Sequence, residues 1–268
     1  MKICITGLGS VGLPTALYVS SRGLETYGYD ISERAVNGAK ERGINATTDW
    51  ESIPACDAYL ICVSTLLKGT APVISPVFDI AKKIASSALD GATLAVESTV
   101  YPGVCRRLHS KIAKGRLRII HVPHRYWAGD PVNHGTRQLR VIGAVDDESL
   151  KAGLRLYKEL LDIPLHVCPS IEVAEACKIV ENTHRYVQIA FSEEIRMLCE
   201  EANIDFEAVR AACNTKWNVD MLEARDGIGG HCLPKDIWYV IRMGRSTLLR
   251  SAVKTDKKYR KWLEEKRR

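Results

Sequence analysis

The sequence predicts an α/β fold, in which a doubly wound parallel sheet is followed by an all-helical region. Two observations support this prediction. Before residue 168, short β-branched apolar runs alternate with helical patterns, as in sheets whose parallel strands are joined by helices. From Ser170 to about Ala202 the chain has helical periodicity and contains neither glycine nor proline, so one long helix is expected there.

The elements are expected to follow one another in a regular order. A first strand at Lys2 to Thr6 leads through a glycine-rich turn into a helix. Further buried strands are expected at residues 25–30, 57–65, 92–99 and 116–123, with intervening helices at 78–89 and 104–114. Everything beyond Ala202 also has a helical pattern, so we place a domain boundary between Cys168 and Pro169.

The composition excludes several classes of protein. With 268 residues, 46% hydrophobic and 26% charged, the chain has the composition of a soluble globular protein and not of a disordered or fibrous one. No segment approaches the roughly 18 uninterrupted apolar residues of a membrane span, so a cytoplasmic protein without membrane contact is expected. Nine scattered cysteines without a CxxC pair argue against a disulfide framework and a structural zinc site, and no metal is expected.

The last residues of the chain are strongly basic. Residues 254–268 contain eight Lys/Arg and three Asp/Glu, a balance of +5 within the net charge of +6. A basic tail can indicate nucleic-acid binding, but Tyr259, Trp262 and Leu263 recur at helical spacing. We therefore expect a helical domain at 169–253, followed at 254–268 by a solvated basic helical tail, and we do not expect nucleic acid as a partner.

A glycine-rich motif follows the first strand. Gly7, Gly9 and Gly12 form a GxGxxG pattern that opens a helix, and Asp30 closes the second strand 18 residues after Gly12. Such glycines bring backbone N–H groups close to a pyrophosphate at a helix N-terminus, while the acid binds the ribose 2′-hydroxyl. A purely structural turn is the alternative, but the context favours a Rossmann-type domain that binds NAD over residues 1–168.

Neighbouring residues complete the expected cofactor site. A carboxylate at Asp30 repels a 2′-phosphate, so NAD is favoured over NADP, and Arg34 is a nearby cation that could weaken this preference. Further cofactor contacts are expected from the glycine turn and from later strand ends, at Val11, Val63, Ser64, Thr65 and Thr99.

Lys178 and Asn182 lie four residues apart in the long predicted helix and therefore share a face. A solvent-facing Lys/Asn pair is common, but Ala174, Cys177 and Tyr186 on that side are not typical of a freely wetted face. A lysine against apolar surroundings can stabilise an oxyanion, and an amide can hold a hydroxyl or a water. Both are candidate catalytic residues.

The segment GIGGHCLPKD, residues 227–236, places a thiol among glycines. Pro234 suits the first turn of a helix, which would put Cys232 just before the helix N-terminus, where backbone N–H groups favour the thiolate. A core role is the ordinary alternative for one cysteine among nine, but this context favours a nucleophile. Asp236 could cap the helix or serve as an acid/base group.

The long predicted helix carries more apolar side chains than a small helical region can easily cover. These are Ile179, Val180, Val187, Ile189, Ile195 and Leu198. Such a surface predicts a homodimer, in which the helical domain serves as the dimerisation domain.

Four motifs in order resemble the UDP-glucose/GDP-mannose dehydrogenase family, from the N-terminus to about Val253. GLGSVGLP looks like the cofactor loop of that family, ESTVYPG like its strand-end threonine motif, AEACKIVENTHRYVQIAFSEEI like its central helix and GIGGHCLPKD like its nucleophile loop. The stretch AEACKIVENTHR is most similar to the branch that oxidises N-acetylmannosamine nucleotides.

This resemblance implies NAD-dependent oxidation of a primary alcohol to a carboxylate. Cys232 would capture the aldehyde from a first hydride transfer as a thiohemiacetal, a second hydride transfer would give a thioester, and water would release the acid. Lys178 and Asn182 would hold the oxyanion and the substrate oxygen, Asp236 would assist proton movement, and Thr99 would orient water.

Two departures from the family pattern affect the expected site. The segment HVPHRYWAGD places His124 where the family carries a water-activating glutamate; a neutral imidazole can act as a base, and a surface histidine is the alternative. After Val253 only the basic tail remains, where family members continue into a third domain that grips the nucleotide. A smaller alcohol substrate, a partner protein or the dimer partner completing the site, or loss of turnover would each be compatible with this.

Two other functions stay open. A two-electron hydroxyacid dehydrogenase also combines a Rossmann domain with a helical domain and a Lys-x-x-x-Asn helix, but it would leave Cys232 without a role. A non-catalytic subunit that binds a cofactor or a partner protein is the third possibility.

Overall fold

The computed structural model describes residues 1–127 and 129–267, which form two compact units, one of residues 1–178 and one beginning at residue 179. Each unit is described by itself. The division falls inside a long helix, after Lys178, and not at the boundary that the sequence predicts between residues 168 and 169.

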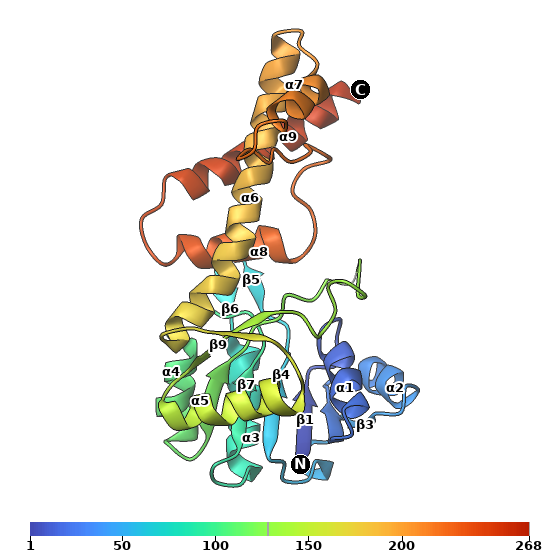
Figure 1. The fold of residues 1–268 in the computed structure, drawn as a ribbon, viewed down its shortest axis with the longest axis vertical. Helices are drawn as coiled ribbons and strands as arrows, with labels where there is room; N and C mark the ends of the chain where they lie inside the picture. The colour runs from blue at the N-terminus through green and yellow to red at the C-terminus, as the bar shows by residue number, and fades with distance from the viewer. Residues whose placement is uncertain (128, 268) are drawn as a thin grey trace. The chain divides into compact units, whose positions relative to one another are not determined.

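The first unit is built on an eight-stranded sheet (Figure 1). The strand order is β10-β9-β8-β7-β4-β1-β2-β3, and neighbouring strands are parallel except for the antiparallel pair β8 and β9. The doubly wound α/β sheet is thus confirmed, with one antiparallel pair in place of a wholly parallel sheet. The strands are β1 (Lys2–Thr6), β2 (Glu25–Tyr29), β3 (Asn45–Thr47), β4 (Ala58–Ile61), β7 (Thr93–Val96), β8 (Arg118–His121), β9 (Arg140–Ala144) and β10 (Leu165–Val167).

Helices cover the sheet and exclude water from its apolar side chains. Alternate strand residues such as Ile5, Leu60 and Ile120 are fully buried against α1 (Gly12–Ser21) and α2 (Glu33–Lys40) in one core cluster. The helix α3 (Ser75–Ser87) packs beside β4, while α4 (Val104–Leu108) and α5 (Asp147–Leu154) pack beside β8. A parallel strand that is buried on both faces must be apolar throughout. The sequences of these strands are therefore nearly continuous apolar runs.

Several short elements were not predicted from the sequence. They are β3, β9, β10, the hairpin of β5 (Leu66–Lys68) and β6 (Ala71–Val73), and the helices α2 and α5. Most of these strands are three residues long and the hairpin is only partly buried, so they lack the continuous apolar run that identified the other strands.

The second unit is helical. The predicted long helix is confirmed as α6 (Ile171–Glu201), whose last 23 residues, 179–201, belong to this unit. It is followed by α7 (Phe206–Cys213), α8 (Cys232–Ile241) and α9 (Leu248–Lys266). The expectation that the whole region is helical was wrong for residues 214–231, which form turns and irregular backbone. No described helix is long and apolar enough to cross a membrane.

The basic end of the chain is not a separate tail in the structure. Helix α9 runs without a break across residues 253 and 254, and Tyr259 is fully buried within it. Tyr259 packs with Met197 and Phe206, and its ring stacks on Trp262 at 5.5 Å between centroids. The helical spacing of these aromatic residues therefore marks a packed face, while the lysines occupy the solvated face.

Candidate active site

The glycine turn has the geometry that close approach of a pyrophosphate requires. Gly7 has a φ of +87°, and a Cβ there would lie 2.8 Å from the backbone of Cys62 and Val63. A Cβ on Gly12 would lie 1.7 Å from the carbonyl oxygen of Gly7, so α1 can begin this close to β1 only with glycine. Gly9, by contrast, is exposed with open space around its Cα, which leaves the backbone accessible to a ligand.

Asp30 lies at the end of β2 beside this turn. Its carboxylate accepts hydrogen bonds from the backbone N–H of Leu8, at 2.6 Å, and of Ser32, at 2.8 Å. Arg34 is exposed in the first turn of α2, and Val11 immediately precedes α1. Because the turn is open at Gly9 and a carboxylate stands at the end of the second strand, these residues fit an NAD nucleotide.

The loops after β4 and β7 are tied together at the carboxyl edge of the sheet. The Thr65 hydroxyl donates to the carbonyl oxygen of Thr99, at 2.9 Å, and the Ser98 hydroxyl lies 2.7 Å from the carbonyl oxygen of Val63. Ser64 between them is exposed. Strands β1 and β4 are neighbours at which the strand order reverses, and open α/β sheets bind ligands at such a point.

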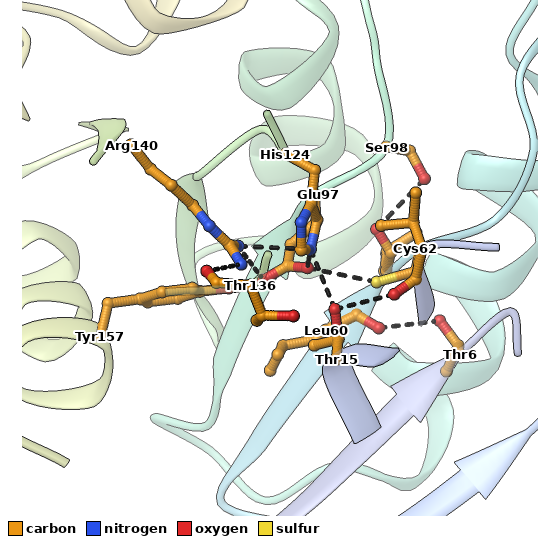
Figure 2. A network of polar contacts seen from close by, with 12 residues as sticks. Thr6, Thr15, Leu60, Cys62, Glu97, Ser98, His124, Thr136, Arg140 and Tyr157 are labelled. Atoms are coloured by element: carbon orange, nitrogen blue, oxygen red, sulfur yellow. Dashed lines mark hydrogen bonds and ion pairs between the residues drawn. The ribbon is translucent and has the colours of Figure 1, made fainter. Parts of the chain in front are cut away.

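His124 belongs to a buried polar network beside these loops (Figure 2). Its Nε2 lies 3.0 Å from the Thr15 hydroxyl and also contacts the carboxylate of Glu97. Glu97 in turn accepts from Arg140, at 3.2 Å, and from the hydroxyl of Tyr157. The alternative of a surface histidine is therefore excluded, because His124 is 7% exposed.

Charge within this network is set by burial and by Arg140. Burial alone would raise the pKa of Glu97, but His124 and Arg140 outweigh it and lower that pKa to about 2. Burial and the charge of Arg140 lower the pKa of His124, so its imidazole is neutral at pH 7. Since Nε2–H then donates to Glu97, Nδ1 carries the lone pair, and this buried atom has no partner among the described residues.

Three members of this network also have metal-binding atoms. Cys62, Glu97 and His124 each offer one such atom, all within 4.8 Å of one another. However, a nitrogen of Arg140 lies 3.2 Å from Glu97 and 3.3 Å from His124, so a buried guanidinium already neutralises the carboxylate. We therefore interpret the cluster as a hydrogen-bonded network and not as a metal centre.

Lys178 lies in the first turns of α6, and the position of this helix start is fixed by Glu175. Glu175, one turn earlier, is fully buried and accepts hydrogen bonds from the backbone N–H groups of Gly103 and Cys105, at 2.6 and 2.8 Å. These contacts fix residues 171–178, the part of α6 that belongs to the first unit, within that unit. The Lys178 side chain is half-buried, and its charge is near enough to lower the pKa of His124 after burial and Arg140.

The second unit brings Asn182 and Asp236 together, 54 residues apart in sequence. The Asn182 amide donates to one oxygen of Asp236 at 2.5 Å, and the Lys235 ammonium lies 2.7 Å from the other oxygen. Asp236 is fully buried and Lys235 is 6% exposed, above the ring of Tyr239 at 4.5 Å. The carboxylate of Asp236 is therefore bound by two side chains, an amide and an ammonium.

Cys232 is the first residue of α8, where the sequence placed it just before the helix. Its side chain is exposed, and the preceding turn contains Gly227 and Gly230 with φ of +90° and +81°. Residues with a Cβ rarely adopt a positive φ. Glycine at these positions therefore allows the chain to turn sharply into the helix. A thiol at an exposed helix N-terminus has the access and the favourable dipole that a nucleophile needs.

Two sequence profiles match most of the chain. Residues 38–161 match the NAD binding domain of the UDP-glucose/GDP-mannose dehydrogenase family, and residues 172–257 match the central domain of the same family. The chain belongs to the UDP-glucose/GDP-mannose dehydrogenase family. Its first unit therefore carries the NAD binding domain of this family, and its second unit carries most of the central domain.

Curated relatives in this family extend beyond the matched region. A UDP-N-acetyl-D-mannosamine dehydrogenase from Methanococcus vannielii is 29% identical, covering 94% of this chain and 64% of the relative. An NDP-N-acetyl-D-galactosaminuronic acid dehydrogenase from Ralstonia solanacearum is 30% identical, covering 89% of this chain and 64% of the relative. The chain thus spans slightly less than two thirds of these relatives.

A solved structure of the family has the same fold. The UDP-D-ManNAc dehydrogenase from Pyrococcus horikoshii superposes with a TM-score of 0.88 at 25% identity, covering 97% of this chain and 69% of that one. The fold class predicted for this member of the UDP-glucose/GDP-mannose dehydrogenase family is thereby supported over nearly its whole length.

Four polar residues of the candidate site were not predicted from the sequence. Glu97, Arg140 and Tyr157 surround His124, and Lys235 pairs with Asp236. Glu97 and Lys235 lie within motifs that had been singled out, beside Thr99 and Asp236, so their positions were available as a signal. Arg140 and Tyr157 are distant in sequence from every motif, and only the folded sheet brings them to the site.

Proposed function

We propose that this protein is an NAD-dependent dehydrogenase that oxidises a primary alcohol of a nucleotide sugar to a carboxylate. The observation that carries the proposal is the exposed Cys232 at the start of α8, on the same helix as the buried carboxylate of Asp236. A nucleophilic thiol in a chain with an NAD binding domain suits a four-electron oxidation, in which an aldehyde must be trapped between two steps.

The proposed reaction has two oxidation steps and one hydrolysis. Bound NAD supplies the hydride acceptor for each oxidation. The Cys232 sulfur adds to the aldehyde formed in the first step, and the thiohemiacetal that results loses a second hydride to become a thioester. Water then attacks the thioester carbonyl and the carbon–sulfur bond breaks, which returns the thiol and releases the carboxylate. Two NAD molecules are reduced, and one water is consumed, for each alcohol.

The other proposed residues act on oxygen atoms and protons. Lys178 provides a positive charge for the oxyanion, while Asn182 orients the substrate oxygen. Asp236, between Asn182 and Lys235, accepts a proton during the first oxidation. Thr99 orients the hydrolytic water, and Nδ1 of His124 is the atom that can accept its proton, since Nε2 is engaged by Glu97.

The proposed substrate is a nucleotide-linked N-acetylhexosamine, because the relatives from Methanococcus and Ralstonia are named as dehydrogenases of such sugars.

We further propose a cytoplasmic homodimer. The support for a dimer is an apolar stripe on α6, formed by Val180, Phe191 and Leu198, which are 46%, 56% and 52% exposed. We also propose that a partner protein could complete the substrate site, and addition of the source cell extract to the activity assay tests this.

The test is the number of NADH molecules formed per substrate consumed. Purified chain, UDP-N-acetylmannosamine and excess NAD should give two NADH, with the acid identified by mass spectrometry. Cys232→Ser should lower kcat about 10³-fold or more and leave the NAD dissociation constant unchanged. One NADH per substrate with an active Cys232→Ser enzyme would favour the two-electron hydroxyacid dehydrogenase. NAD binding without turnover of any nucleotide sugar or smaller alcohol, also after addition of the source cell extract, would favour a non-catalytic subunit.

A further inference from the structure

The turn that leads to Cys232 is held through its backbone as well as by the buried side chains of Ala224 and Ile228. Within residues 224–228, three carbonyl oxygens and one N–H group are bonded to side chains of α9 or α6. Backbone contacts of this kind fix the path of a chain, whereas side-chain packing alone would leave irregular residues freer to move. The groups that make these contacts therefore determine where the turn delivers Cys232.

Both backbone polar groups of Ile228 are hydrogen-bonded to one pair of side chains on α9. Its N–H donates to Asp256 at 2.8 Å, and its carbonyl oxygen accepts from Arg260 at 2.6 Å. Arg260 also donates to both oxygens of Asp256, at 3.1 and 3.2 Å, one helical turn away. The ion pair is thus pre-assembled on the helix, with one donor and one acceptor directed at the same residue.

Two neighbouring side chains, Tyr259 and Arg196, extend this hold toward the start of the turn. The buried Tyr259 hydroxyl donates to the carbonyl oxygen of Arg225 at 2.7 Å. Arg196 on α6 donates to the carbonyl oxygen of Ala224 at 2.6 Å and to the Tyr259 hydroxyl at 2.7 Å. Gly227 completes the fit, because a Cβ there would lie 2.8 Å from the Arg260 side chain.

We propose that Asp256, Tyr259 and Arg260 form a clamp on α9 that positions the Cys232 loop, and that Asp256 and Arg260 are positioning residues for the proposed reaction. The basic end of the chain then has a defined task in the second unit. Three residues, 229–231, separate Ile228 from Cys232. All three are exposed and two of them are glycine, so Ile228 is the last firmly held residue before the thiol. This inference rests on the proposed function for its kinetic part only.

The first measurement is hydrogen exchange and needs no substrate. In Asp256→Ala and in Arg260→Met, backbone N–H groups of residues 225–232 should exchange about tenfold faster or more than in the natural protein, while those of α7 should not change. The matched control is Lys261→Met, which breaks an exposed pair with Glu265 at 3.6 Å on the same helix. It should leave exchange in the loop unchanged.

The second measurement separates positioning from stability. At a temperature well below the unfolding midpoint, Asp256→Ala and Arg260→Met should lower kcat about tenfold or more, with little change in KM or NAD affinity. Asp256→Asn keeps an acceptor for the Ile228 N–H and should recover part of kcat. Gly227→Ala keeps both charged residues but separates them from the loop, so it should reproduce the defect.

The outcomes distinguish the clamp from the proposed function. Exchange in residues 225–232 that stays within about twofold of the natural protein in both variants would overturn the clamp, whatever the activity. If the natural protein turns over no substrate, the proposed function fails and hydrogen exchange still decides the clamp. If Arg260→Met does not fold, Arg260→Lys and Gly227→Ala provide the same comparison, and normal kcat in both would overturn the positioning role.

Discussion

At the scale of single residues, Asp30 should determine which dinucleotide the protein binds. Its carboxylate stands beside the glycine turn and would repel a 2′-phosphate, so NADH should bind about tenfold or more tightly than NADPH. Asp30→Asn retains an acceptor for the Leu8 N–H but removes the charge, and should reduce this preference about tenfold. Fluorescence titration of both cofactors measures the ratio.

Arg34→Ala is the control for this prediction. Arg34 is exposed on α2 and is the neighbouring cation that could attract a 2′-phosphate. Its removal should weaken NADPH binding and leave NADH binding within about twofold. Equal affinity of the natural protein for the two cofactors would contradict the assignment of Asp30.

His124 illustrates what a residue alone cannot reveal. The sequence identified its unusual position, but its burial depends on Glu97 and Arg140, which reach it from β7 and β9. A histidine in this setting is neutral because burial and a neighbouring guanidinium both disfavour its charged form. Such an environment is a property of the assembled sheet, so the sequence left both a base and a surface histidine open.

At the scale of elements, α6 contains a buried carboxyl group that should make stability depend on pH. Glu193 is fully buried, and neither of its oxygens has a hydrogen-bond partner among the described side chains and backbone. Burial and the nearby Asp256 raise its pKa from 4.5 to about 8, against the opposing effect of Arg260. The protonated form is therefore the one that the folded state favours.

The sign of the effect follows from proton binding. Between pH 4.5 and 8 the folded state holds the Glu193 proton more tightly than the unfolded state, so stability decreases as pH rises through this window. Glu193→Gln imitates the protonated side chain at every pH. It should match the natural protein below pH 4.5 and be more stable by about 3 kcal/mol at pH 7, since each pH unit contributes about 1.4 kcal/mol.

Urea unfolding between pH 5 and 8 measures this difference. Glu194→Gln is the matched control, because Glu194 is the exposed neighbour on the same helix and should leave the pH dependence unchanged. A Glu193→Gln variant whose stability runs parallel to that of the natural protein across this range would show that Glu193 is not protonated at neutral pH.

At the scale of the whole molecule, the exposed apolar stripe on α6 should mediate a homodimer. Val180, Phe191 and Leu198 are spaced eleven and seven residues apart, about three and two helical turns, and therefore share one face. Val180 and Leu198 belong to the dimer surface predicted from the sequence. Ile179, also predicted there, is fully buried inside one chain, and Phe191 was not predicted. The stripe is narrower than predicted but lies on the expected helix.

Phe191→Asp should convert the dimer to a monomer in light scattering at about 10 µM, since a charge in an apolar interface costs several kcal/mol. The control is Ile204→Asp, which adds the same charge at a residue that is 52% exposed and lies beyond α6. A monomeric natural protein at this concentration would contradict the proposed dimer.

The sequence predicted the architecture better than the site. The alternation of apolar runs and helices is a local property, so β1, β4, β7, β8 and α6 were recognisable from their own residues. The reversal at β8 and β9 and the path of residues 214–231 depend on contacts with distant elements. For the same reason Asp236 was found through its motif, whereas its contacts to Asn182 and Lys235 required the packed helices.

The contacts made by α9 determine where a recombinant form of this protein can be truncated at its C-terminal end. The profile of the central domain ends at residue 257, inside α9, and a truncation placed there retains Asp256 but removes Tyr259 and Arg260. The remaining carboxylate would lose its cation while still facing the buried Glu193. An assay of such a truncated protein would report the loss of this support and not the capacity of the two matched domains. A purification tag therefore belongs beyond Lys266, with the helix left whole.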